Sequence, residues 1–573
     1  MKQGPCLVWN AQVPPQRGRI GANDAQIGLD TTELRLAWES RSWAERPRRV
    51  YSAPLHHGIV MGMLKADLEA AGFELVETHI SWVFLGEVEV FKVKRPVDVG
   101  FLDFTTLEKR REACDAEVRL NRRLAPDVYI DVVPITVDAT GVHEIAGRGT
   151  VVDWAVHMHR LAIKSRADEL LKAGLLQPAH IDELAVHIAR FHESLSCDAE
   201  TSRYGDVTTI RRNVRENFAQ TRGSIGDYLS AEQASEIESW QVDVLGDEER
   251  FTARVETGRV RDGHGDLRLE HVYFGTDRSI TIIDCIEFNE RFRHGDICAD
   301  IAFLSMDLAW HGRVDLAERF LARYARESND YDLYSVVNFY ESYRAFVRGK
   351  VAALLADDTE ASTDARERAR REARRYFLLA LAYERPPLVP PRVVLVGGMI
   401  ASGKSRTAAT IGALLAAPVV SSDRTRKHLM GLGPTASMQS KAWSGAYSPS
   451  VTEAVYEELW RLSDVIISSG RPVVLDASFR TAAMRATARR LAERHGVPFL
   501  FVECSAPRQL ILERLAARDR VVAHESDART DVLEEFERRF EPIDELPPSE
   551  RFRLDTSRPR EDAQKELEAI FGS

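Results

Sequence analysis

The chain has 573 residues, of which 44% are hydrophobic and 29% are charged, so it is long enough to form two or more globular domains. Its formal net charge of −11 argues against a general nucleic-acid-binding protein. The six cysteines are scattered without a C-x-x-C pair, which argues against a zinc site and a disulfide framework. We expect a cytoplasmic protein, because we find no run of about 18 apolar residues and no apolar signal-peptide core.

The first 60 residues differ from the rest of the chain. They contain proline, arginine, glutamine and tryptophan without a sustained period. A helical pattern begins at Met61 or Met63 and ends at Gly72. We therefore expect residues 1–60 to be a poorly ordered extension, or the result of a start codon assigned too far upstream. The sequence leaves both interpretations open.

Three short strands are predicted next, over residues 73–76, 80–85 and 88–93. The third ends in F-K-V-K-R-P, and the alternation of strand side chains places Lys92 and Lys94 on one face. A buried strand lysine is costly unless it meets an anion, and ATP phosphate would supply one. The alternative is a solvated edge strand, and the sequence does not choose between the two lysines.

A long helix is predicted from Thr106 to Leu124. Glu117 lies near its apolar face and is a candidate partner for the strand lysine, with Glu108 and Glu112 as competitors. Further strands follow through residues 151–158. Helical patterns then dominate, over residues 181–195, 207–220 and 231–245.

The stretch from His264 to Asp300 has the strongest chemical pattern in this part of the chain. It contains H-G-D-L-R-L-E-H, followed by two short strands over residues 272–274 and 280–283 around a Gly-Thr-Asp turn. This arrangement places Asp266 in a loop and Asp284 after the second strand. Two such carboxylates suit phosphoryl transfer, because one accepts the hydroxyl proton and the other holds Mg²⁺ against ATP. Two ordinary loop aspartates are the alternative.

Asp296 and Asp300 sit at or near the start of the next predicted helix, and we expect them to fix the loop rather than contact substrate. The chain is then largely helical to Tyr383. Strands first, then helices, then this block is the order of an α+β protein-kinase-like bilobal domain, which we place at residues 61–385. Residues 386–392 are rich in proline and form the best candidate for a linker.

A second domain is predicted at residues 393–573. A strand over residues 393–396 precedes G-G-M-I-A-S-G-K-S and a helix that runs through Leu415. Gly398, Gly403, Lys404 and Ser405 satisfy the Walker A pattern G-x-x-x-x-G-K-[ST] in its strand–loop–helix setting. The glycines let backbone N–H groups approach phosphate, Lys404 reaches the β- and γ-phosphates, and Ser405 reaches Mg²⁺.

The remaining pattern alternates strands and helices, with strands over residues 419–420, 473–475, 499–502 and 552–554. It predicts an α/β P-loop NTPase domain with a mostly parallel sheet. Asp423 and Asp476 follow the second and third strands, where ligands bind. Asp423 is a candidate base or substrate ligand, and Asp476 a candidate Mg²⁺ ligand through water. Arg514 and Arg518 are candidates for a lid over the phosphates, with a surface helix as the alternative.

The first domain resembles the aminoglycoside phosphotransferase family, whose motif H-G-D-L-H-x-x-N precedes an I-D strand. The resemblance implies that Asp266 is the catalytic base, Asp284 a metal ligand, Lys92 the ATP lysine and Glu117 its partner. The fusion as a whole resembles bifunctional aminoglycoside phosphotransferase/ATP-binding proteins. Its second domain is similar to the small P-loop kinases that include gluconate kinases, chloramphenicol phosphotransferases and zeta toxins.

The first domain departs from the family motif at two positions. His271 replaces the expected asparagine, so it stands where a second metal ligand is expected, and Arg268 replaces the second histidine. Neutral imidazole is a poorer Mg²⁺ ligand than an amide oxygen. Either metal binding is rearranged or the activity of this domain is reduced.

The resemblance implies an ATP- and Mg²⁺-dependent phosphotransferase that acts on a hydroxyl of a small molecule, such as an aminoglycoside or amino sugar. A second ATP-binding P-loop kinase domain accompanies it. We expect no membrane partner, and the net charge argues against nucleic acid. One alternative is a non-catalytic kinase-fold binding module coupled to a P-loop ATPase or nucleotide switch. Another is a kinase that acts on a protein or a nucleotide.

Overall fold

The computed structural model describes residues 55–573, except residues 79, 99, 101, 359–361, 382–387, 434–444, 519–532 and 573, and except the side chains of residues 55–62 and of Arg518. Most of the predicted extension, residues 1–54, lies outside the described residues. The first helix, α1 (Leu55–Ala70), begins before the predicted start at Met61, because Gly58 and two histidines dilute its apolar pattern. The predicted domain boundaries stay predictions, and residues 386–387 of the predicted linker are not described.

The first part of the chain begins with a six-stranded antiparallel sheet of order β1-β2-β3-β6-β4-β5. The first three strands and the sixth match the four strands predicted over residues 73–158 to within a few residues, whereas the fourth and fifth had no predicted bounds. They are β1 (Glu74–Glu77), β2 (Ser81–Leu85), β3 (Glu89–Lys94), β4 (Tyr129–Val137), β5 (His143–Ile145) and β6 (Thr150–His159).

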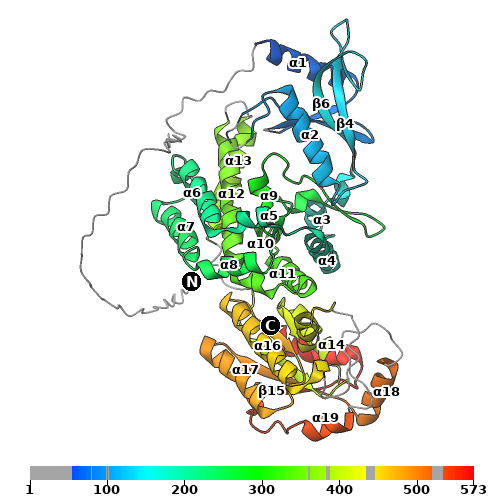
Figure 1. Cartoon of the computed structure of the whole chain (residues 1–573), viewed down its shortest axis with the longest axis vertical. Coiled ribbons are helices and arrows are strands. Elements are labelled where there is room, and N and C mark those ends of the chain that lie inside the picture. Colours follow the sequence, from blue (N-terminus) through cyan, green and yellow to red (C-terminus); the bar gives the residue numbers. More distant parts are fainter. Residues whose placement is uncertain are drawn as a thin grey trace, which may run out of the picture. The chain divides into compact units, whose positions relative to one another are not determined.

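Helix α2 (Leu107–Asn121) lies beside β4 and β6 (Figure 1). It begins at the N-cap Thr106, whose hydroxyl accepts a hydrogen bond from the Lys109 amide. One face of α2, which includes Cys114 and Val118, is buried against strand residues such as Val156. That face also places Glu117 toward the sheet, where the strand lysines lie.

The remainder of the first part is mainly helical and contains two short two-stranded sheets. The predicted hairpin is present as β8 (Val272–Phe274) paired with β9 (Ile280–Ile282), and β7 (Val260–Asp262) pairs with β10 (His294–Asp296). The helices are α3 (Ala167–Lys172), α4 (Pro178–Ser194), α5 (Ala199–Ser202), α6 (Val207–Thr221), α7 (Ala231–Val244), α8 (Glu248–Glu256), α9 (Glu290–Arg293), α10 (Cys298–Trp310), α11 (Val314–Ser328), α12 (Val337–Asp357) and α13 (Thr363–Leu379).

The second part contains a five-stranded parallel sheet of order β12-β13-β11-β14-β15. Every residue of the central strand β11 is buried, as is typical of a parallel strand covered on both faces. The strands are β11 (Val393–Gly398), β12 (Val419–Ser421), β13 (Val473–Asp476), β14 (Phe499–Ser505) and β15 (Arg551–Asp555). The helices are α14 (Lys404–Leu415), α15 (Ser422–Leu429), α16 (Pro449–Ser468), α17 (Ala482–His495), α18 (Arg508–Arg518), α19 (Leu533–Arg539) and α20 (Arg560–Phe571).

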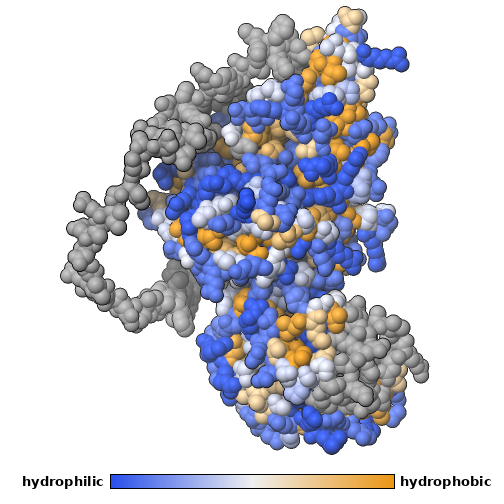
Figure 2. Space-filling model, in the orientation of Figure 1, coloured by the Kyte–Doolittle hydropathy of each residue, from blue (hydrophilic) through white to orange (hydrophobic). Residues whose placement is uncertain are grey.

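These two architectures confirm the predicted fold class. An antiparallel sheet with its helix α2 precedes a helical lobe, as in a kinase-like α+β fold, and a parallel α/β sheet with a phosphate-binding loop follows. The face in Figure 2 is largely hydrophilic, with apolar residues in smaller groups. In the described part of the chain, none of the helices combines the length and apolar composition needed to span a bilayer.

A buried ion triad holds the helical lobe together and generates a stability prediction. Arg254 on α8 donates hydrogen bonds to both carboxylate oxygens of Asp296, at 2.9 and 2.8 Å, and of Asp330, at 2.5 and 2.9 Å. All three side chains are at most 3% exposed. We expect Arg254→Ala to lower the free energy of unfolding by about 3–5 kcal/mol, because it leaves buried Asp296 without its cation and Asp330 with only the long contact to Arg259 Nε, at 3.8 Å.

Urea denaturation followed by circular dichroism would measure this loss. Arg313→Ala is the matched control, because Arg313 forms a similar two-bond pair with Asp315 at the surface, at 2.8 and 2.6 Å. The control should change the free energy of unfolding by less than about 1 kcal/mol. Equal losses in the two variants would contradict the prediction.

Candidate active site

Two lysines of β3 and one glutamate of α2 form the buried ionic centre of the first part. Lys92 Nζ donates to Glu117 Oε1 at 2.8 Å and to Asp284 Oδ1 at 2.7 Å. Lys94 Nζ donates to Glu117 Oε2 at 2.5 Å and also pairs with Glu287. The predicted pairing of Glu117 with a strand lysine is therefore present. The two lysines differ in their second partner. Lys92 pairs with the candidate metal ligand Asp284, whereas Lys94 pairs with Glu287.

The competing glutamates do not take part in this centre. Glu108 and Glu112 are exposed on the outer face of α2, whereas Glu117 is fully buried. Burial acts to raise the pKa of Glu117, but the charges of Lys92 and Lys94 hold that pKa below its usual value. The carboxylate is therefore ionised between two cations. Glu287 is a functional candidate that sequence analysis missed, since 193 residues separate it from Lys94.

The loop that follows β7 is fixed by hydrogen bonds to Asp300 of α10. The Asp300 carboxylate accepts the backbone N–H groups of His264 and Gly265, at 2.6 and 2.8 Å, which confirms that Asp300 fixes the loop. The same expectation was wrong for Asp296, because its carboxylate is taken up by Arg254 and the Cys298 amide.

His264 is a neutral structural residue of the loop. Its Nδ1 accepts the Asp266 amide at 3.3 Å, so Nε2 bears the proton and donates it to the Ile283 carbonyl at 3.0 Å. Burial lowers the pKa of His264 to about 4, which keeps the ring uncharged. The bond to Ile283 connects the loop to the segment that follows β9 and leads to Asp284, and the bond from the Asp266 amide lies within the loop.

Arg268 pairs with Asp266, a contact that sequence analysis did not foresee. Its Nε and Nη2 donate to the two carboxylate oxygens of Asp266, at 3.0 and 3.2 Å, and it also pairs with Glu270. Burial acts to raise the pKa of Asp266, but the positive charge of Arg268 holds that pKa well below the usual range. The only sequence signal for this pair was the D-x-R spacing of Asp266 and Arg268.

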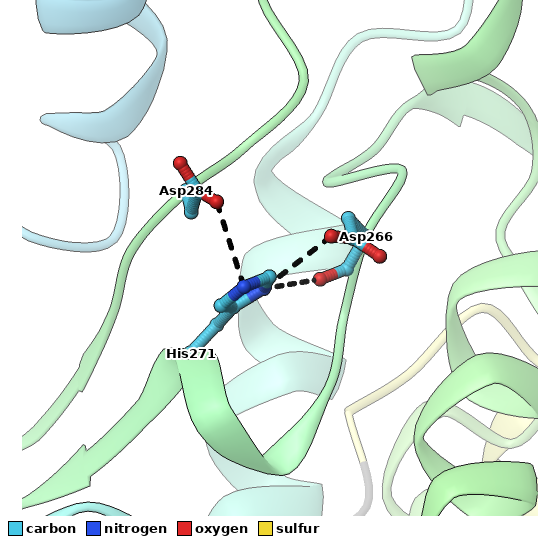
Figure 3. A group of neighbouring side chains, drawn as sticks. All are labelled: Asp266, His271 and Asp284. Atoms are coloured by element: carbon cyan, nitrogen blue, oxygen red, sulfur yellow. Dashed lines mark hydrogen bonds and ion pairs between the residues drawn. The ribbon is translucent and has the colours of Figure 1, made fainter. Parts of the chain in front are cut away.

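His271 lies between the two aspartates (Figure 3). Its Nδ1 is 2.7 Å from the Asp266 carbonyl oxygen and 3.7 Å from Asp266 Oδ2, and its Nε2 is 3.5 Å from Asp284 Oδ2. Each of the three residues offers an atom within 4.8 Å of the others, so the set fits one divalent cation. The positive charge of Lys92 outweighs the effect of burial and holds the pKa of Asp284 well below its usual range.

The second part places the Walker A residues around a tight loop between β11 and α14. Gly398 and Gly403 have φ angles of 130° and 94°, which favour glycine. A Cβ atom at Gly398 would lie 2.4 Å from the Cys504 carbonyl oxygen, so a side chain is also excluded sterically. Lys404 Nζ donates to the Met399 carbonyl at 2.7 Å, across the same loop.

The predicted acidic residues of the second part lie close to this loop. Asp476 ends β13, is 6% exposed and is hydrogen-bonded by Ser405. Burial raises the pKa of Asp476 to about 6, with Asp423 adding to the rise and Lys404 opposing it. Asp423 follows β12, as predicted, and lies in the first turn of α15.

The two predicted lid arginines have different outcomes. Arg514 on α18 donates to the Ala401 carbonyl at 3.3 Å and to the Thr556 carbonyl at 2.7 Å, so it lies against the phosphate-binding loop. The side chain of Arg518 lies outside the described residues.

Known families and proteins match parts of this chain or most of it. Residues 393–543 match the family model described as an AAA domain. The chain is 33% identical over 487 residues to the uncharacterized protein Rv2004c of Mycobacterium tuberculosis, a match that covers 85% of this chain and 92% of the relative. The chain belongs to the family of this mycobacterial protein. The uncharacterized protein Mb2027c of Mycobacterium bovis matches with the same identity and coverage.

Solved structures of kinases are similar to each part of this family member. The GDP complex of wild-type aminoglycoside 2'-phosphotransferase-IIIa is 16% identical, with a TM-score of 0.34, and covers 56% of this chain and 98% of that chain. A gluconokinase from Sinorhizobium meliloti 1021 is 17% identical, with a TM-score of 0.24, and covers 32% of this chain and 92% of that chain.

The pKa of Asp476 generates a pH prediction for nucleotide binding. Metal binding needs the ionised carboxylate, so Mg²⁺-dependent ATP binding should weaken by up to about tenfold per pH unit below a pH of about 6. Isothermal titration with Mg²⁺ and ATP between about pH 5 and 8 would measure this dependence. Asp476→Asn should bind more weakly and lose the step near pH 6; the same step in that variant would assign it to another group.

Proposed function

We propose that the chain is an ATP-dependent phosphotransferase whose first domain transfers the γ-phosphate to a hydroxyl of a small molecule, such as an aminoglycoside or amino sugar. The observation that supports this most directly is the convergence of Lys92, Asp266 and Asp284. They come from β3, the loop after β7 and the end of β9, yet Lys92 contacts Asp284, and Asp284 and Asp266 share one candidate metal site. Phosphoryl transfer needs such a set of positioning and charge-neutralising groups.

The contacts of the candidate site residues in the first domain suggest a role for each of them. Lys92, held by Glu117 and paired with Asp284, would bind the phosphates of ATP. Asp284 and His271 would hold Mg²⁺, which when bound neutralises charge on the phosphates. Asp266 would orient the acceptor hydroxyl and take its proton; because its pKa is low, it is a weak base and acts mainly by position.

The second domain is proposed to bind ATP at Gly398–Ser405, with Lys404 on the phosphates. Ser405 and Asp476 would hold Mg²⁺, directly and through water, because the two side chains are hydrogen-bonded at the mouth of the loop. Asp423 would serve as a base or bind an acceptor hydroxyl. Arg514 and Arg518 would cover the phosphates, since α18 already contacts the loop through Arg514.

A second candidate function is a kinase-fold binding module coupled to a P-loop nucleotide switch. The pairing of Asp266 with Arg268 favours it, because this guanidinium occupies both oxygens of the carboxylate that would receive the proton. His271 in place of an amide ligand favours it as well. The intact Lys92–Glu117–Asp284 contacts favour catalysis.

The two ATP sites are separable by mutation. We expect Lys404→Ala to weaken ATP binding by about tenfold or more, because it removes the ammonium that neutralises the phosphates, and Asp266→Ala to leave binding largely unchanged. Titration of the full chain with a fluorescent ATP analogue would measure both. Arg406→Ala, an exposed cation on the same helix, is the control. Unchanged affinity in Lys404→Ala would mean that the P-loop is not the main site.

Transfer itself is tested with a panel of aminoglycosides, amino sugars and sugar alcohols. We expect ADP release with at least one acceptor, and a loss of about 10²-fold or more in Asp266→Asn. Asp315→Asn removes an exposed carboxylate outside the site and should leave the rate unchanged. Turnover that depends on Lys404 but not on Asp266, or no transfer to any acceptor, would favour the binding-module function.

A further inference from the structure

A cavity of about 60 Å³, lined by both polar and apolar residues, lies beside the loop that Asp300 fixes. Gly263 and Asp300 form part of its wall, so it adjoins the loop from the α10 side. Other lining side chains come from α6, α12 and the segment around α9. They are Asn213, Arg291, His294, Tyr340, Tyr343 and Arg344.

The acidic groups of the wall are already engaged. The Asp296 carboxylate pairs with Arg254 through two hydrogen bonds, and the Asp300 carboxylate accepts two backbone N–H groups. Arg291 and Arg293, which also line the cavity, pair with Glu216 and Asp262 outside it. A cationic ligand would find no spare carboxylate in this wall.

Arg344 differs from the other two arginines because its charge is only partly compensated. It is 9% exposed, and its Nε donates to the Ala299 carbonyl at 3.1 Å. The contact to Asp300 Oδ1 is long, at 4.0 Å from Nη2, and the guanidinium otherwise lies over the Phe303 ring, 4.7 Å from its centroid. A buried guanidinium with so few acceptors is costly, and a planar carboxylate or a phosphate would supply them in pairs.

Two further polar atoms among the cavity-lining residues have no hydrogen-bond partner in the described part of the chain. They are Asn213 Oδ1 and His294 Nδ1, and both are buried. Buried polar groups are usually satisfied by protein, water or ligand. A cavity of 60 Å³ accommodates about four water-sized groups, which is close to the size of a phosphate or a small hydroxy acid.

We propose that this cavity is a binding site for a small anion, a phosphate or a short hydroxy acid, whose acid group pairs with Arg344. A hydroxyl of the ligand would donate to Asn213 Oδ1, and another ligand oxygen would accept a hydrogen bond from His294 Nδ1. Because Arg344 also approaches Asp300, which holds the loop that contains Asp266, a bound anion would change the electrostatic environment of that loop. The proposal goes beyond the phosphotransferase function and does not depend on it, since binding is measurable without ATP.

The test is thermal-shift and calorimetric titration of the full chain with inorganic phosphate, sulfate and D-glycerate, and with choline chloride as the cation, all at matched ionic strength. We expect saturable binding of at least one anion, none of choline, and at least a tenfold loss of affinity in Arg344→Gln. Arg319→Gln is the matched control, because Arg319 is a partly buried arginine that pairs with Asp182 away from the cavity. It should bind as the wild type does.

Asn213→Leu provides a second variant if Arg344→Gln does not fold. It fills the cavity from α6 without removing a charge, and it should also abolish saturable binding. With ATP present, Arg344-dependent ADP release on glycerate would identify the anion as an acceptor, and binding without turnover would identify it as an effector. Equal shifts in the wild type, Arg344→Gln and Asn213→Leu, or no saturable binding of any anion, would overturn the proposal.

Discussion

The buried carboxylate of Glu117 between Lys92 and Lys94 is the interaction on which the first site depends. Without its two cations, this fully buried charge would be expensive to keep, and without it each lysine would lose one of its two anionic partners. The arrangement joins β3 to α2 and, through Asp284 and Glu287, joins both to the chain after β9. One ionic centre therefore fixes the sheet, the helix and the candidate metal ligand relative to one another.

The two candidate sites of the chain both combine cations with carboxylates, but different structural elements hold them. In the first part, side chains that are distant in sequence supply the cations and carboxylates, and the loop between them is held by Asp300. In the second part, a local strand–loop–helix unit supplies backbone N–H groups, with Lys404 and Asp476 added at its edge. The first site therefore depends on the packing of several elements, whereas the second is largely encoded in eight consecutive residues.

This difference explains what the sequence could predict. The parallel sheet, the Walker A loop, the β8–β9 hairpin and the pairing of Glu117 with a strand lysine all leave local or periodic signals. The bond between Asp266 and Arg268 leaves almost none, because a D-x-R spacing does not fix the side-chain torsions that bring the groups together. Glu287 and the paired state of Asp296 depend on partners far away in the chain. The early start of α1 was missed because histidine and glycine obscure an apolar period.

The Asp266–Arg268 pair has a consequence for water. A carboxylate whose two oxygens are held by a guanidinium does not readily deprotonate a solvent molecule that enters the cleft, because the water would first have to displace a charge-assisted contact. A larger acceptor, bound through many contacts, has the binding energy to redirect the arginine and expose the aspartate. If the first domain transfers phosphate as proposed, the Asp266–Arg268 pair would limit futile hydrolysis of ATP.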